Sequence, residues 1–190
     1  AITSHPANTA ACVGSNASFT VAASGSGLSY NWQVSTDAGA TWNNTIPAVT
    51  TATLTLTGVT AGMNNNQYRC VVSIVCNPVG VNSNAATLTI NPSPVISSQP
   101  TNTAVCAGTN AGFCVTATGF NLTYQWQVST TGCTGTWTNI TGETNSCITL
   151  NAVTASMNNN NYRCIVTGGC TPAVTSDCVT LTVNTAAAIT

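Results

Sequence analysis

The chain of 190 residues contains one pattern of residues twice, 94 positions apart. A repeat of this length is too long for the unit of a solenoid and suits one β-sandwich domain of ~100 residues. The repetition therefore predicts two tandem domains that share one fold. The residues that recur are Cys12, Gly14, Phe19, Val21, Tyr30, Trp32, Tyr68, Arg69, Cys70 and Cys76, which reappear as Cys106, Gly108, Phe113, Val115, Tyr124, Trp126, Tyr162, Arg163, Cys164 and Cys170.

Charged side chains are almost absent. The chain has two Arg, three acidic residues and no Lys, so nucleic acid is excluded as a partner because phosphates require basic side chains. Thr (36) and Asn (23) supply the polar groups instead, and Thr suits a pleated surface. Abundant Thr without a long 3.6-residue period predicts an all-β fold. No apolar run approaches the ~20 residues of a membrane helix, so no membrane insertion is expected.

Alternating apolar residues predict the strands of each repeat. The segment from Cys76 to Pro78 is expected to be a turn, and Pro92 and Pro94 indicate a short, stiff linker. The predicted division is a first domain at 1–91, a linker at 92–95, a second domain at 96–184 and a link to a possible next repeat at 185–190. Strands of the first repeat are expected at 1–6, 8–13, 18–22, 28–34, from 41, 53–57, 68–72 and 86–90, and the second repeat has the same series.

The two ends of the sequence share three letters. Ala188-Ile189-Thr190 repeats Ala1-Ile2-Thr3, as if a third repeat began there. We therefore expect the 190 residues to be a segment, or a mature unit, of a longer repeating fibre.

The strand residues resemble those of an intermediate-set immunoglobulin domain. The resemblance rests on the run from Gly14 to Val21, then Trp32, Leu54-x-Leu56 and Tyr68-x-Cys70. The wording Tyr-x-Trp-Gln-Val-Ser-Thr, followed by a Gly-rich turn and a Trp, is similar to the repeats of very large secreted adhesins and surface fibres of gliding, type IX-secreting bacteria. The resemblance implies two Greek-key sandwiches with Trp32, Trp126, Tyr68 and Tyr162 in their cores. In this family a tyrosine corner lies two residues before the cysteine of strand F.

Ten cysteines indicate an oxidising, extracellular or cell-surface location. No CxxC motif or pair of His accompanies them, so neither a metal site nor a cofactor is expected. In the immunoglobulin family the strand-F cysteine bonds a strand-B cysteine, but the strand-B positions here hold Val21 and Val115. The resemblance therefore implies that Cys70 and Cys164 are buried free thiols packed against the core tryptophans.

Four further cysteines, Cys12, Cys76, Cys106 and Cys170, lie towards the ends of the predicted sandwiches, and two pairings remain open. In the first, Cys12 bonds Cys170 between the domains, Cys76 bonds the preceding domain and Cys106 the following one. In the second, each domain closes on itself through Cys12–Cys76 and Cys106–Cys170. We prefer the first, because cysteines at opposite ends of one sandwich do not approach within ~7 Å.

The second repeat adds four more cysteines. Cys114 and Cys147 alternate with inward apolar residues on strands that are neighbours in the immunoglobulin family. Directly opposed residues lie ~4.5–5.5 Å apart, so a cross-strand disulfide is expected. Cys133 in a turn and Cys178 on the last strand are expected to bond each other or another chain.

No catalytic group is predicted, because the three acidic residues are scattered and His5 is the one imidazole. Two functional classes remain. The first is a structural component of an extracellular fibre or adhesin stalk, with neighbouring copies of the repeat as partners. The alternative is a carbohydrate-binding accessory module, with surface polysaccharide as the partner. Trp42 and Trp137 could stack on sugars in that case, although partial caps of the core are the more common role.

Overall fold

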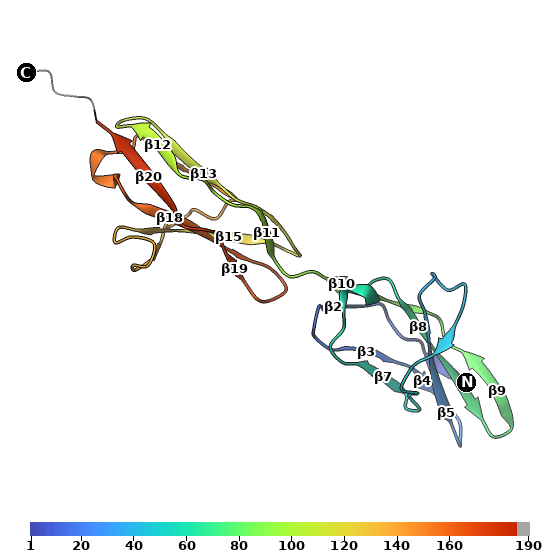
Figure 1. Ribbon diagram of the computed structural model, residues 1–190. Helices are drawn as coiled ribbons and strands as arrows, with labels where there is room; N and C mark the ends of the chain where they lie inside the picture. Colours follow the sequence, from blue (N-terminus) through green and yellow to red (C-terminus); the bar gives the residue numbers. More distant parts are fainter. Residues whose placement is uncertain (186–190) are drawn as a thin grey trace, which may run out of the picture. The chain divides into compact units, whose positions relative to one another are not determined.

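The computed structural model describes residues 1–185, so most of the link predicted at 185–190 lies outside the described residues. The chain divides into two units, one from Ala1 to Pro92 and one from Ser93 onward (Figure 1). Within residues 1–185, each unit consists of strands and a single short 3-10 helix, which confirms the all-β prediction.

Unit 1 is a sandwich of two layers. Its main sheet has the order β2-β10-β8-β5-β6, with β9 also paired to β8, and the pairs β1–β4 and β3–β7 form the opposite layer. Strand β2 runs parallel to β10, whereas the other pairs are antiparallel. The elements are β1 (Ile2–Ser4), β2 (Thr9–Cys12), β3 (Ala17–Thr20), β4 (Ala22–Ala23), β5 (Ser29–Ser35), β6 (Asn43–Asn44), β7 (Thr53–Leu56), η1 (Ala61–Met63), β8 (Gln67–Ile74), β9 (Asn77–Asn82) and β10 (Ala86–Asn91).

Unit 2 repeats this topology, with the main sheet β12-β20-β18-β15-β16. Strand β19 pairs with β18, and β11–β14 and β13–β17 form the opposite layer. The elements are β11 (Val95–Ser98), β12 (Thr103–Cys106), β13 (Ala111–Cys114), β14 (Thr116–Thr118), β15 (Thr123–Ser129), β16 (Thr138–Asn139), β17 (Cys147–Leu150), η2 (Ala155–Met157), β18 (Asn161–Thr167), β19 (Val174–Thr175) and β20 (Val179–Asn184).

Aromatic side chains fill the core between the two layers of each unit. Trp32 has no exposed surface, and its Nε1 donates a hydrogen bond to the Thr51 carbonyl (3.0 Å). The ring of Phe19 stacks on Tyr68 with 4.8 Å between the centroids. Unit 2 has the same core with Trp126, Phe113 and Tyr162. Stacked aromatic rings stabilise a core by more than the area that they bury. Both units contain such a stack, so each unit has its own core.

Asparagine side chains hold the last strand of unit 1 in place. Asn8 Oδ1 accepts a hydrogen bond from the Thr87 N–H, and Asn64 Oδ1 accepts one from the Ile90 N–H, both at 2.8 Å. Asn65 has φ of 67°, a left-handed conformation that Asn tolerates better than most residues. These Asn side chains therefore bind backbone groups of the neighbouring strand. The matching acceptors of unit 2 are Asn102 and Asn158, again at 2.8 Å.

Several boundaries differ from the sequence predictions: the strand expected at 1–6 is Ile2–Ser4, that at 18–22 is divided into β3 and β4, and three further differences have a clear physical cause. The turn predicted at Cys76–Pro78 is wrong, because the turn falls at residues 75–76 and β9 starts at Asn77. Strand β9 is an edge strand, where Pro78 is tolerated. The strand expected from Thr41 starts at Asn43, since the Thr41 N–H bonds the Asp37 carboxylate in a turn (2.9 Å). Val95, predicted in the linker, is the first residue of β11 because it pairs with Thr118.

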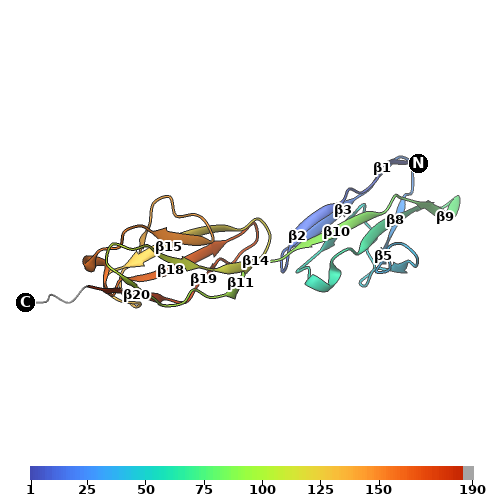
Figure 2. The same ribbon diagram turned by 90° about the horizontal axis from the view of Figure 1, so that it is seen from above.

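The β8–β9 hairpin is the main difference between the units. Strand β9 has six residues, whereas its counterpart β19 has two. Figures 1 and 2 both show β9 at the end of unit 1 that holds the N-terminus. Unit 1 therefore carries an extended hairpin at its entry end.

Candidate functional site

Two cysteines lie in the cores. Cys70 on β8 pairs directly across from Trp32 on β5, and Cys164 pairs in the same way with Trp126. Both cysteines are fully buried free thiols. Burial raises the pKa of each thiol to about 11, so both stay protonated at neutral pH and are poor nucleophiles.

Unit 2 contains a disulfide that joins two neighbouring strands within one layer of the sandwich. Cys114 and Cys147 face each other in the β13–β17 register, with 4.1 Å between their Cα atoms, and they are bonded. Unit 1 has Thr20 and Thr53 at the same positions, and their hydroxyl oxygens lie 3.0 Å apart. The same cross-strand position thus carries a covalent link in one unit and a hydrogen bond in the other.

A second disulfide of unit 2 joins Cys133 to Cys178, with 5.8 Å between the Cα atoms. Cys133 lies in the loop between β15 and β16, and Cys178 directly precedes β20. Of the two alternatives for these cysteines, the bond to each other is the one present. The bond ties the loop to the strand that closes the domain.

The remaining cysteines differ in state. Cys76, in the turn of the β8–β9 hairpin, and Cys106, the last residue of β12, are exposed free thiols. Neither within-domain pair, Cys12–Cys76 nor Cys106–Cys170, is therefore present. Cys12 and Cys170 are not free. The cysteine of the hairpin region is thus a free thiol in unit 1 (Cys76), and the cysteine at the end of the first main-sheet strand is a free thiol in unit 2 (Cys106).

An arginine lies over a tryptophan in each unit. The Arg69 guanidinium carbon is 4.2 Å from the ring centroid of Trp42, and Arg69 Nε donates a hydrogen bond to Gln33 Oε1 (2.9 Å). Unit 2 repeats the stack with Arg163 over Trp137 at 4.3 Å. Trp42 and Trp137 are partly buried by these stacks and lie outside the two core clusters. Both arginines of the chain therefore have a structural partner.

Asp37 organises the loop after β5. Its carboxylate accepts hydrogen bonds from the Thr41 hydroxyl, the Thr41 N–H and the Ser35 hydroxyl. These bonds, with that of the Thr41 hydroxyl the most important, lower the pKa of Asp37 to about 2. Asp37 is therefore a loop acceptor that stays ionised.

His5 also has a structural partner. Its Nδ1 accepts a hydrogen bond from the Asn84 N–H (3.0 Å). In unit 2 the side-chain oxygen of Gln99 accepts the matching bond from the Asp177 N–H (2.9 Å). A side-chain amide oxygen thus accepts in unit 2 the hydrogen bond that the imidazole accepts in unit 1. The imidazole of His5 is therefore a hydrogen-bond acceptor here.

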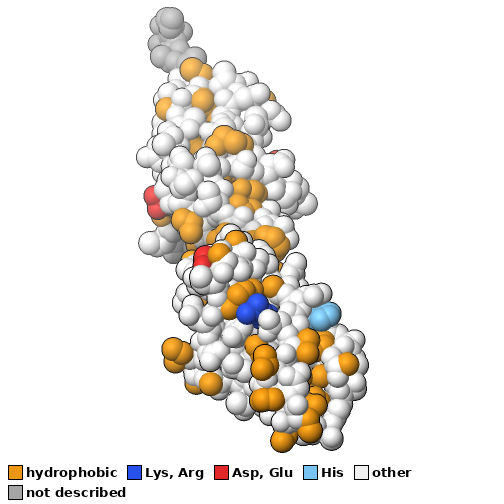
Figure 3. All heavy atoms as spheres, turned by 90° about the vertical axis from the view of Figure 1, so that its right-hand side faces the viewer, with side chains coloured by type: hydrophobic (Ala, Val, Ile, Leu, Met, Phe, Trp, Pro, Cys, Tyr) orange, Lys and Arg blue, Asp and Glu red, His pale blue; other side chains and the backbone are white. Residues whose placement is uncertain are grey.

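Residues 1–185 contain no group of three or more His, Cys, Asp or Glu side chains that could hold a metal ion. Over the same residues, no helix is long and apolar enough to cross a membrane. Figure 3 shows one face of the molecule, on which charged side chains are few and hydrophobic ones lie among polar ones.

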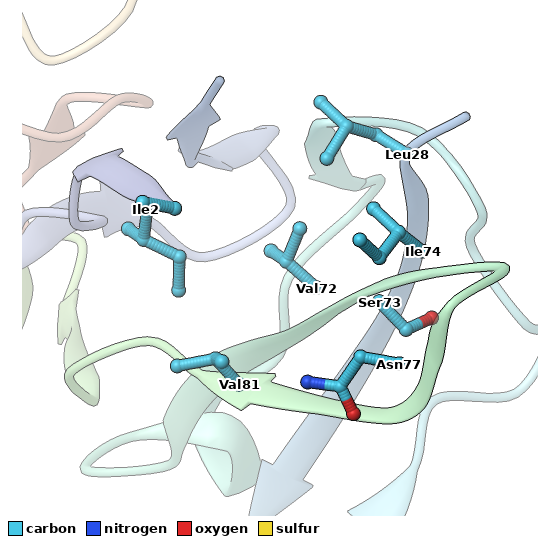
Figure 4. A pocket seen from close by; sticks show the side chains of 8 residues that line it. Ile2, Leu28, Val72, Ser73, Ile74, Asn77 and Val81 are labelled. Carbon is cyan, nitrogen blue, oxygen red and sulfur yellow. The ribbon is translucent and has the colours of Figure 1, made fainter. Parts of the chain in front are cut away.

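A hollow of about 110 Å³ lies beside the β8–β9 hairpin (Figure 4). Its lining includes Ala1 and Ile2 from the start of the chain, Leu28, and Val72, Ile74 and Val81 from the hairpin. The hollow is small and mostly apolar, and no titratable side chain lines it.

Two sandwiches in series with this topology define a pair of tandem immunoglobulin-like domains. The solved structures agree with this fold. DIP-gamma IG1+IG2 is 16% identical with a TM-score of 0.58, over 96% of this chain and 96% of that one. The titin I-band fragment I67–I69 is 15% identical with a TM-score of 0.68, over 97% of this chain and 65% of the fragment. Domains 3–5 of Drosophila OTK are 15% identical with a TM-score of 0.57, over 97% of this chain and 61% of that one.

The sequence comparison identifies the family. Residues 2–92 and 95–185 each match the model described as a domain of unknown function (DUF8696), and the chain belongs to that family. A search of curated proteins found no match. At these identities the solved structures show the fold alone.

Proposed function

We propose that the chain is a structural segment of an extracellular fibre or adhesin stalk, in which immunoglobulin-like domains follow one another end to end. The observation that carries this proposal is the placing of the cysteines. Each unit has one cysteine at the end of its first main-sheet strand and one in the hairpin region at its other end. Neighbouring domains can then be linked covalently without Lys or metal. The disulfides of unit 2 favour an oxidising, extracellular location.

The first link that we propose is Cys12–Cys170. Cys12 is the last residue of β2 and lies opposite Asn91, just before the chain leaves unit 1. Cys170 lies between β18 and β19 in unit 2. The Ser93 hydroxyl donates to the neighbouring Thr171 carbonyl (2.9 Å), so unit 2 receives the chain beside Cys170. A bond between these cysteines would stiffen the junction and let it carry tension.

The neutral surface supports the same function. The net charge is −1, and few charges repel a neighbouring chain. Near-zero net charge promotes association, which suits lateral contact between fibres. The adhesin repeats that the sequence resembles give a bacterial surface as the expected setting.

Carbohydrate binding is the second candidate, and it depends on Trp42 and Trp137. Both indoles are partly exposed, but a guanidinium already covers one face of each. Sugar stacking needs an open ring face, so at most one face of each ring remains for a ligand. The stacks therefore favour the structural function over polysaccharide binding.

Two measurements test the proposal. Electron microscopy of native material is expected to show beaded filaments, and non-reducing peptide mapping is expected to recover Cys12 joined to Cys170. A native particle that stays monomeric and compact in solution scattering would contradict the fibre. Recovery of Cys12 or Cys170 in another pair would rule out the Cys12–Cys170 link between the domains. The sequence repeat would then be the remaining support for the fibre.

A further inference from the structure

We propose that Cys76 of one copy forms a disulfide with Cys106 of a second copy, and that the apolar β8–β9 hairpin guides the two ends together. The inference rests on the proposed function and deepens it, because it names the surfaces that join successive copies.

The first argument is that the two free thiols are complementary in position. Cys76 is the repeat equivalent of Cys170, and Cys106 is the repeat equivalent of Cys12. If Cys12 and Cys170 link the two units of one chain, the same junction between two copies places Cys106 of one against Cys76 of the next. The two thiols needed for that junction are the exposed free thiols of the structure.

The second argument is that each thiol lies at the correct end of its unit. The Cys76 turn belongs to the hairpin whose residues line a hollow together with Ala1 and Ile2, at the chain's entry. Cys106 pairs with Asn184, the last residue of β20, where the chain leaves unit 2. A head-to-tail contact between copies therefore brings the two thiols to one junction.

The third argument is the surface around Cys76. Val75, on one side of it, is 89% exposed, and Val79 and Val81 on β9 are 85% and 55% exposed. Gly80 has φ of 77°, and a Cβ there would lie 2.9 Å from the Val72 carbonyl oxygen, so β9 is held close against β8. An exposed apolar patch beside a reactive group marks an interaction surface. Unit 2 has no counterpart, because β19 has only two residues.

The occupant that these observations select is a second copy of the chain. A contact between unlike surfaces is heterologous, and such contacts build open filaments when the rotation does not close a ring. Burial of the valines by the exit end of unit 2 would hold the thiols together while the bond forms. Solvent would then be excluded from the junction.

The chemistry needs a low-molecular-weight disulfide, RSSR, as the oxidant. The Cys76 thiolate attacks RSSR, forms the mixed disulfide Cys76–S–S–R and releases RSH after protonation. The Cys106 thiolate of the second copy then attacks the Cys76 sulfur and releases the second RSH. Two thiols are oxidised, and one RSSR is reduced to two RSH.

Serine variants test this pairing. The 190-residue protein, incubated with oxidised glutathione, is expected to give a ladder of disulfide-linked multimers on non-reducing gels. Cys76→Ser alone and Cys106→Ser alone are each expected to stay monomeric. An equimolar mixture of the two is expected to give dimers and nothing larger, with a Cys76–Cys106 peptide in the digest. A disulfide-linked dimer formed by Cys76→Ser alone or by Cys106→Ser alone, or no dimer in the mixture, would overturn the pairing.

A second pair of variants tests the hairpin. Val75→Thr with Val79→Thr keeps the β-branched shape and removes apolar surface, and it is expected to slow dimer formation in the mixture at least fivefold. Val95→Thr is the matched control, because Val95 is a strand valine, 58% exposed, outside both the hairpin and the β12 end. Equal rates for the two variants would refute guidance by the hairpin. Native filaments without a Cys76–Cys106 peptide would refute this inference and leave the fibre standing.

Discussion

The cross-strand disulfide of unit 2 can be exchanged for the arrangement that unit 1 uses. The double substitution Cys114→Thr with Cys147→Thr places two threonines where unit 1 has Thr20 and Thr53. The backbone register of β13–β17 is the same as that of β3–β7, so the variant is expected to fold. The substitution removes the covalent link and leaves the strand pairing in place.

The expected loss follows from the loop that the disulfide closes. The two cysteines are 33 residues apart, which corresponds to about 3.7 kcal/mol of chain entropy in the unfolded state. A Thr–Thr pair across the strands returns about 0.2–1 kcal/mol. The net loss is about 3 kcal/mol, and at ~5 °C per kcal/mol for a domain of this size the Tm of unit 2 falls by about 15 °C.

Calorimetry of the whole chain without reductant measures this shift. Hydrogen exchange, measured separately for peptides of each unit, assigns each transition to its unit. The reciprocal variant, Thr20→Cys with Thr53→Cys, is the control and is expected to raise the Tm of unit 1 once oxidised. A Thr variant whose unit 2 melts within about 3 °C of the unmodified protein would refute the argument, as would a loss confined to unit 1.

Three further outcomes are expected. His5→Gln should leave the Tm of unit 1 unchanged, because Gln99 accepts the matching bond, whereas His5→Ala should lower stability by about 1 kcal/mol in thermal melts. The depressed pKa of Asp37 stabilises unit 1 above its unfolded pKa, near 4, and this contribution disappears as the pH falls through about 2; Asp37→Asn should flatten that part of the pH–Tm curve. Cys70 and Cys164, with pKa values raised to about 11, should resist iodoacetamide in the native protein at pH 8 and react after unfolding, and mass spectrometry with Cys76 as the fast-reacting reference checks this.

Alternation of apolar residues predicted the strands and the outward direction of Cys114 and Cys147, whereas the sandwich followed from the repeat length and the resemblance. The rule that side chains alternate between faces, together with the neighbouring strands of the resembled family, brings these two residues opposite each other. Alternation did not predict β9, since Asn77, Pro78 and Gly80 are turn-forming residues. Pairing with β8 overrides those local preferences, because β9 gains backbone hydrogen bonds there.

The stack of Arg69 on Trp42 was also not predicted from the sequence. The two residues are far apart along the chain and meet only when β8 lies beside β5. A signal did exist, since each repeat contains one arginine and one tryptophan outside the core. A recurring cation with a recurring aromatic ring is a candidate pair.

The amide acceptors that hold β10 and β20 make the stability of the fold depend little on the salt concentration. Asn8, Asn64, Asn102 and Asn158 bind backbone N–H groups, and their amides neither titrate nor attract counter-ions. Salt weakens interactions between exposed charges. The chain has only five charged residues, so few such interactions can be weakened. The Tm should therefore barely move between 10 mM and 1 M sodium chloride. A domain tied in this way is expected to keep the same fold in fresh water and in brine.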